Sequence, residues 1–139
     1  MTEDRHGLDL FELAYPGPLR DQLVAAVMSG AKTSTSSLLV EFEHAGEALP
    51  FEGQRRVLVD SELRAVGIVQ DTEVRQVPLG EVDLVFAREE GEGYESVASW
   101  REAHEEYWNA SVPGVDLDDS TVVIAERFRL VERLDPEAG

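Results

Sequence analysis

Lys32 is the only lysine among the 12 basic residues of this chain, and all the others are arginine. A bias toward arginine codons would explain this imbalance, and so would a need for lysine at this one position. A desolvated lysine can lose its proton and act as a nucleophile or a base, whereas arginine cannot be deprotonated. We therefore treat Lys32 as the first candidate functional residue.

Glu126 conflicts with its surroundings in the last predicted strand. Alternation along that strand places it on one face with four large apolar residues, Val122, Ile124, Phe128 and Leu130. A carboxylate that faces a core needs a partner or a raised pKa. An edge position, a bulge or an ion pair with an arginine would satisfy Glu126 structurally, whereas a place in a polar pocket would make it functional.

Most other patterns that mark catalytic or metal sites are absent from the sequence. The chain has no cysteine, no HExxH or GxSxG motif and no dinucleotide-binding fingerprint. The three histidines, His6, His44 and His104, lack the spacing of metal ligands. The acidic run at residues 89–92 is either a solvated helix end or a pair of metal ligands. We expect neither a metal nor a cofactor.

The residues before Lys32 predict the helix that positions it. The turn at 15–18 and apolar residues at helical spacing predict a helix from Pro18 to about Met28, which Gly30 ends. Lys32 then follows a helix C-terminus, where the helix dipole favours a cation. Residues 33–37 are predicted to be extended and to lead into a strand over 38–42, before a loop at 44–53.

The rest of the chain predicts further strands and two more helices. The predicted strands cover residues 56–60, 65–69, 72–77 and 121–132. A second helix begins near residue 79, with Val82, Val85 and Phe86 on its apolar face. A third helix covers about 97–108 and carries one stripe of Trp100, His104, Tyr107 and Trp108. This stripe is more typical of core packing than of base stacking.

The composition is that of one globular domain with a strong negative charge. The 139 residues include 29 acidic and 12 basic side chains, which give a net charge of −17. We expect one domain over 11–133 between flexible ends at 1–10 and 134–139. The charge disfavours long duplex DNA, which is bound through many basic contacts. No apolar run reaches the ~20 residues of a membrane helix, so we expect a cytoplasmic protein without membrane contacts.

The order of three motifs resembles a known family. Residues 30–35 read GAKTST, which has the form GxKxxT and directly follows the predicted helix; residues 86–93 read FAREEGEG; and the last strand contains Glu126-Arg127-Phe128. In this order they resemble the ASCH domain family, a branch of the PUA-like superfamily, from about Phe11 to Val131. The resemblance implies an α+β fold, a small mixed β-barrel with two to three packed helices, and a cleft lined by GxKxxT.

The resemblance also implies a site. ASCH proteins are generally thought to act in RNA-linked processes, and one small bacterial branch hydrolyses the acetyl amide of 4-acetylcytidine through a Lys, a Thr and a Glu. By motif position these residues are Lys32, Thr35 and Glu90. In such a reaction Thr35 supplies the nucleophilic hydroxyl, a desolvated Lys32 takes its proton, and Glu90 orients the site or protonates the leaving amine.

Three further residues, Tyr15, Ser37 and Glu126, are expected to bind the ligand in the same cleft. Ser37 stands where many members carry an arginine, which makes phosphate binding less favourable. If Lys32 pairs with Glu126, it is a charged binding group and the pocket performs no chemistry.

Three functions remain open from the sequence. The first is hydrolysis of an acyl amide on a nucleoside, and the second is a non-catalytic module that binds a nucleoside, a nucleotide or a modified RNA. The third is a ribonuclease, which the negative charge and the lack of a histidine pair near the motif disfavour. The expected partner is a nucleoside-like small molecule or a short single-stranded RNA. The sequence does not specify an oligomeric state.

Overall fold

A mixed five-stranded sheet with the strand order β1-β3-β4-β5-β2 organises the computed structural model, which describes residues 7–134. In chain order, the elements are β1 (Leu10–Phe11), α1 (Pro18–Ser29), β2 (Ser34–Leu38), α2 (Leu39–Ala45), β3 (Arg55–Val59), β4 (Ala65–Pro78), η1 (Leu79–Glu81), α3 (Leu84–Glu89), α4 (Val97–Ser111) and β5 (Val122–Arg133). β1 pairs with β3 in parallel, and the other three pairings are antiparallel. The predicted α+β class is confirmed; the sheet is barrel-like but not closed, because β1 and β2 end the strand order.

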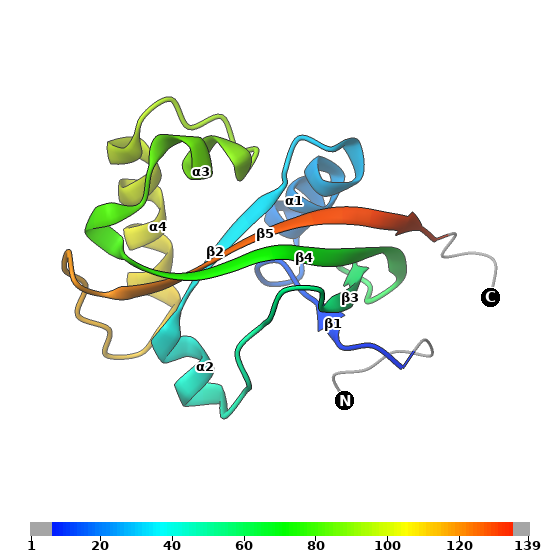
Figure 1. Ribbon diagram of the computed structural model, residues 1–139, viewed down its shortest axis with the longest axis horizontal. Coiled ribbons are helices and arrows are strands. Elements are labelled where there is room, and N and C mark those ends of the chain that lie inside the picture. Colours follow the sequence, from blue (N-terminus) through cyan, green and yellow to red (C-terminus); the bar gives the residue numbers. More distant parts are fainter. Residues whose placement is uncertain (1–6, 135–139) are drawn as a thin grey trace.

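The long pairing of β4 with β5 forms the centre of the sheet. Figure 1 shows these two strands side by side along the molecule, with α3 and α4 together near one end of them. The predicted segments at 65–69 and 72–77 are one continuous strand, and its register with β5 shifts between Asp71 and Glu73. Gly67 lies close to its neighbours, since a Cβ there would lie 2.8 Å from Leu130 Cδ1 and the leucine side chain would have to move.

Two clusters of buried apolar residues flank the region where the helices meet the sheet. One joins the helices α3 and α4 to the sheet and includes Phe86, Trp100, Trp108, Val123 and Ala125. The other packs α1 against the opposite part of the sheet and includes Val24, Val27, Leu58, Val69 and Phe128. The predicted packing role of Trp100 and Trp108 is therefore confirmed, since both are buried.

The prediction of a strand over residues 38–42 is wrong, because most of this segment belongs to the helix α2. The strand is the preceding segment, β2, which pairs with β5 from Ser34↔Arg127 to Leu38↔Val123. The helix α2 begins directly after it because the Glu41 carboxylate accepts a hydrogen bond from the Leu38 backbone N–H at 2.8 Å. A carboxylate in the first helical turn satisfies a free N–H group and stabilises the helix start.

The second predicted helix also begins later than expected. Residues 79–81 form a short 3-10 turn, and α3 starts after Asp83, whose side chain accepts from the Phe86 N–H at 2.8 Å. Val82 and Phe86 are buried as predicted, but Val85 is 65% exposed and does not belong to the apolar face.

Two other expectations concern the ends of the chain and the lack of a membrane-spanning helix. Residues 1–6 and 135–139 of the predicted flexible ends lie outside the described residues, and β1 starts at Leu10. Within the described range, each helix is too short or too polar to cross a membrane.

Candidate functional site

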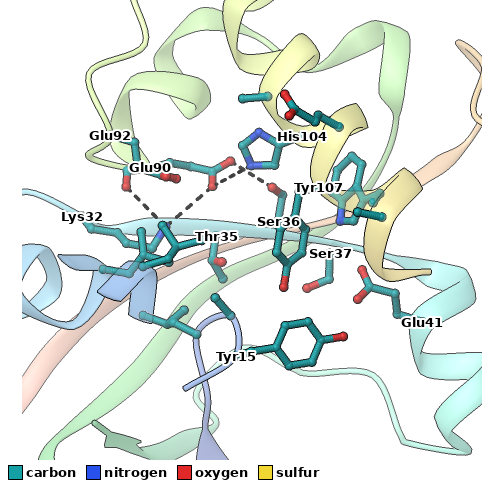
Figure 2. A pocket seen from close by; sticks show the side chains of 18 of the residues that line it. Tyr15, Lys32, Thr35, Ser36, Ser37, Glu41, Glu90, Glu92, His104 and Tyr107 are labelled. Carbon is teal, nitrogen blue, oxygen red and sulfur yellow. Dashed lines mark hydrogen bonds and ion pairs between the residues drawn. The ribbon is translucent and has the colours of Figure 1, made fainter. Parts of the chain in front are cut away.

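A pocket of about 650 Å³ lies where α1, β2 and α4 meet the loop after α3. Five of the six predicted site residues line it, namely Tyr15, Lys32, Thr35, Ser37 and Glu90. Figure 2 shows Lys32 and Thr35 at a level between His104, above them in this view, and Tyr15, below them. The structure therefore brings the GxKxxT segment and the acidic run together, although they are far apart in the sequence.

The backbone around Lys32 is tied to the loop after α3. Gly30 ends α1 in the left-handed conformation, with φ 86°, and the Thr33 N–H donates to the Glu89 carbonyl at 2.7 Å. Gly91 packs so closely that an added Cβ would lie 2.5 Å from the Ala31 carbonyl oxygen. Gly91 also has φ +75°, so two independent constraints require glycine at this point.

The Lys32 amine is buried and surrounded by acceptors. Its side chain is 2% exposed. Nζ donates to the Ser34 carbonyl at 2.7 Å and to the Glu90 carbonyl at 3.3 Å, and it lies 3.6 Å from Glu90 Oε1. Three acceptors match the three donors of an ammonium group. Lys32 therefore pairs with Glu90 and not with Glu126.

The Glu90 carboxylate is the centre of the site (Figure 2). Oε2 accepts hydrogen bonds from Ser36 Oγ at 2.9 Å and from Trp100 Nε1 at 2.5 Å, while Oε1 lies 3.3 Å from His104 Nε2. Burial alone would raise the pKa of Glu90, but the His104 hydrogen bond and the Lys32 charge outweigh it and lower that pKa. Glu90 is thus a fixed anion and a poor proton donor.

His104 belongs to the site, although the sequence indicated only a packing role. Its ring stacks on Trp100 with a centroid distance of 4.3 Å, and Nδ1 lies 2.8 Å from the Trp100 carbonyl oxygen. Burial lowers the pKa of His104, but the hydrogen bond and charge of Glu90 more than compensate and raise it above its ordinary value. The sequence could have suggested this residue only through its place on the same helical stripe as Trp100.

Glu126 does not line this pocket, in contrast to the expectation. Its Oε1 accepts from Arg56 Nη2 at 2.5 Å, and the same Nη2 lies 3.0 and 3.1 Å from the two oxygens of Asp71. All three side chains are largely buried, with exposures of 3%, 13% and 0% for Glu126, Arg56 and Asp71. Burial, together with the neighbouring Asp71, raises the pKa of Glu126 to about 8 despite the opposing effect of Arg56. The arginine partner, one of the structural alternatives, is thus present, and the pair becomes fully ionic only above this pKa.

One cluster in the pocket has the composition of a metal site. Ligand atoms of Glu90, Glu92 and His104 all lie within 4.8 Å of one another. However, Glu90 already faces four donors, and one of them is the Lys32 ammonium group. A divalent cation at this position would be repelled by that ammonium, so the donor set favours an ion-pair network and not a metal.

Both the sequence and the fold of the chain are similar to those of known proteins. The ASCH domain family matches residues 12–132. An ASCH domain structure from Lactobacillus crispatus superposes with a TM-score of 0.80 at 23% identity, over 89% of this chain and 79% of that one. A structure from Enterococcus faecalis superposes with a TM-score of 0.82 at 23% identity, over 94% and 80%. No curated protein matches the sequence. Because the family match spans nearly the whole described chain and the fold agrees, this protein belongs to the ASCH domain family, with its PUA-like, barrel-like fold.

Proposed function

We propose that the pocket binds a nucleoside-like ligand and that Lys32, Thr35 and Glu90 form a centre that hydrolyses an acyl amide on it. The observation that carries the proposal is the convergence of a buried amine, a carboxylate and a hydroxyl on one cavity of about 650 Å³. Pockets of roughly 300–1,000 Å³ suit small organic ligands. The family's association with RNA makes a nucleoside, or a modified nucleotide in a short single strand, the favoured ligand class.

The aromatic lining supports a flat heterocyclic ligand. Tyr94, Tyr107 and Trp108 line the pocket, and Tyr15 contributes a ring that is 65% exposed. Burial and the charges of Glu92 and Glu90 raise the pKa of Tyr94, so its phenol keeps its proton and can donate a hydrogen bond. Aromatic faces stack on planar rings of any base, which gives affinity without strict sequence recognition.

The proposed reaction is acyl transfer to Thr35 followed by hydrolysis. The Thr35 hydroxyl oxygen adds to the acyl carbonyl, the C–N bond breaks, and the amine leaves with the proton that the hydroxyl gave up. Water then hydrolyses the ester and restores Thr35. Lys32 either carries that proton as a neutral amine or, as an ammonium, stabilises the oxyanion while the proton passes to the leaving nitrogen through the water that later hydrolyses the ester. Its three acceptors favour the ammonium, and Glu90 holds it in place.

The full pairing of Lys32 also favours a second candidate, a module that binds the same ligand without chemistry. An amine whose N–H donors all bind acceptors within the protein has a structural role in the pocket wall. In that case the pocket would recognise a modified nucleoside or the end of a short RNA. A cytoplasmic location is part of both proposals, and both leave the oligomeric state open.

Turnover of 4-acetylcytidine by the purified protein separates the two candidates. The release of cytidine is followed by liquid chromatography, and binding is followed by calorimetry. Under the hydrolase proposal, Thr35→Val lowers kcat by ~100-fold or more, as expected for the loss of a nucleophile. Thr72→Val, a change at an exposed threonine of β4, is the matched control. Binding without turnover supports the second candidate, and the absence of both refutes the proposal.

The variants of Lys32 identify its role. Lys32→Arg keeps the positive charge but cannot give up a proton, whereas Lys32→Met removes both properties. Partial activity in Lys32→Arg alone indicates oxyanion stabilisation, and equal loss in both indicates proton transfer. A rate that neither change affects would exclude Lys32 from the reaction. The thermal midpoint of each variant is measured alongside, because both changes are made at a buried position.

A further inference from the structure

The walls of the pocket carry far more negative than positive charge. Five glutamates line it, Glu12, Glu41, Glu90, Glu92 and Glu106. In the described part of the chain, Lys32 and His104 are the basic side chains that line it. Both of these already face Glu90, at 3.6 and 3.3 Å. The positive charge is therefore used within the protein and is poorly available to a ligand.

The remaining glutamates differ in how well they are compensated. Glu12 lies 3.3 Å from the buried guanidinium of Arg20, and Glu41 accepts the Leu38 N–H at the start of α2. Among residues 7–134, Glu92 and Glu106 have no hydrogen bond or ion pair, although Glu92 feels the nearby charges of Lys32 and His104. These two carboxylates come from the loop after α3 and from α4, so they add negative charge on the side of the pocket where His104 lies.

The pKa directions of these groups reflect mainly their partial burial in the pocket wall. Desolvation raises the pKa of Glu41, and it raises the pKa of Glu92 even though that side chain remains exposed. The neighbouring Glu90 adds to the effect at Glu92, against the opposing charges of Lys32 and His104. An anionic ligand would increase this repulsion, whereas a cationic ligand would relieve it.

Aromatic residues line the pocket together with the glutamates. Tyr15, Tyr94 and Tyr107 line the same cavity as the glutamates, whereas Trp108 is buried, at 2% exposure. Aromatic faces combined with carboxylates bind planar cations, because both attract positive charge. Neither group favours a phosphate, for which arginines and free backbone N–H groups are the usual partners.

From these observations we infer that the pocket selects its ligand by charge: it accepts a planar, nucleoside-type ligand that is uncharged or positively charged, and it rejects the phosphorylated form. The inference rests on the proposed function for the nucleoside part of the ligand and adds the charge class to it. It narrows the proposed ligand class to free nucleosides, or to a base with a cationic substituent, and excludes the nucleotides and RNA ends that the proposed function alone would allow.

Calorimetry with three ligands that differ only at the 5′ position tests this selection. The ligands are cytidine, cytidine 5′-monophosphate and 5′-amino-5′-deoxycytidine, which are neutral, anionic and cationic at neutral pH. At low salt we expect the cationic ligand to bind at least tenfold more tightly than the anionic one, with cytidine between them. The difference should shrink as salt is added. Tighter binding of the monophosphate than of cytidine would overturn the inference.

Two small aromatic ions keep this test independent of nucleoside recognition. Benzamidine and benzoate are planar ions of similar size and opposite charge. If the three nucleosides fail to bind but benzamidine binds more tightly than benzoate, the charge selection stands and the nucleoside proposal falls. If benzoate binds at least as tightly as benzamidine, or if none of the five compounds binds, the charge selection is overturned.

Charge-removing variants locate the source of the selection. The double change Glu92→Gln and Glu106→Gln should reduce the preference for the cationic ligand by about tenfold or more, because two unpaired charges are lost. The double change Glu81→Gln and Glu102→Gln, at two exposed positions outside the pocket, is the matched control and should leave the preference intact. Equal effects of the two double changes would show that only the overall charge of the protein matters, which would overturn the assignment.

Discussion

Replacing Glu126 by glutamine should make the stability of the protein less dependent on pH. In the folded protein Glu126 shares one arginine, Arg56, with a second buried carboxylate, Asp71. Burial and Asp71 raise the pKa of Glu126 to about 8 from its ordinary value of 4.5. Between these two values the folded protein keeps a proton that the unfolded chain has lost. The free energy of unfolding therefore falls as the pH rises through this range.

The size of the effect follows from the two pKa values. Each pH unit between 4.5 and 8 contributes ~1.36 kcal/mol, so the upper limit is about 5 kcal/mol. Glu126 shares Arg56 with the neighbouring Asp71, so only part of this limit belongs to Glu126 alone. We expect Glu126→Gln to gain at least about 2 kcal/mol relative to the original protein when both are taken from pH 5 to pH 9, because glutamine does not titrate.

Urea unfolding at several pH values measures this difference. The fluorescence of the buried Trp100 and Trp108 reports the transition, and each protein is measured at pH 5, 7 and 9. Glu132→Gln, at an exposed position of the same strand, corrects for the loss of one negative charge. If the curves of free energy against pH for Glu126→Gln and the control run parallel, the proposed proton on Glu126 does not exist and the reasoning is refuted.

Three other changes give outcomes that the structure predicts. Gly91→Ala should destabilise the protein by about 2 kcal/mol or more in thermal unfolding, since the new Cβ meets the Ala31 carbonyl and the backbone has a positive φ. Lys32→Met should cost about 3–5 kcal/mol in urea unfolding, because it leaves the buried Glu90 carboxylate without its cation. His104→Gln should remove a stabilisation that is complete below the unfolded pKa, near 6.5, and disappears as the pH rises through the higher folded value.

Each of these changes has a control or an opposing result. Gly93→Ala has a similar positive φ but open space around the new Cβ, so a loss as large as in Gly91→Ala would show that contact with Ala31 is unimportant. A Lys32→Met protein as stable as the original would mean that Glu90 takes up a proton at little cost. For His104→Gln, a stability difference that stays constant between pH 5 and pH 9 would contradict the pairing with Glu90.

The helix before Lys32 and the strands of the sheet could be predicted from the local sequence. The start at Pro18, the left-handed end at Gly30 and the period of the apolar residues are properties of adjacent residues. The secondary structure of residues 38–42 could not be predicted in this way, because a short apolar run fits a strand and a helix equally well. What decides between them is the Glu41 carboxylate, which closes on the Leu38 N–H only once the chain has turned.

The candidate site was only partly predictable, for a different reason. The family motif placed Lys32, Thr35 and Glu90, and the structure brings them to one pocket. The sequence could not identify the partner of Glu126, since Arg56 lies 70 residues away in the sequence and any of several arginines could have formed the pair. The part of His104 in the site depends on the rotation of α4 against the sheet, which tertiary packing determines.

The position of Glu90 ties the existence of the pocket to the docking of one helix. Its carboxylate gathers donors from β2, from α4 and from the segment after α1, which are Ser36, Trp100, His104 and Lys32. A protein molecule in which α4 has detached lacks both a wall of the cavity and two of these donors. A bound ligand therefore stabilises the attached form, and slower amide hydrogen exchange in α4 would report its binding. Ligand binding in the pocket and the attachment of α4 to the rest of the molecule are therefore thermodynamically linked.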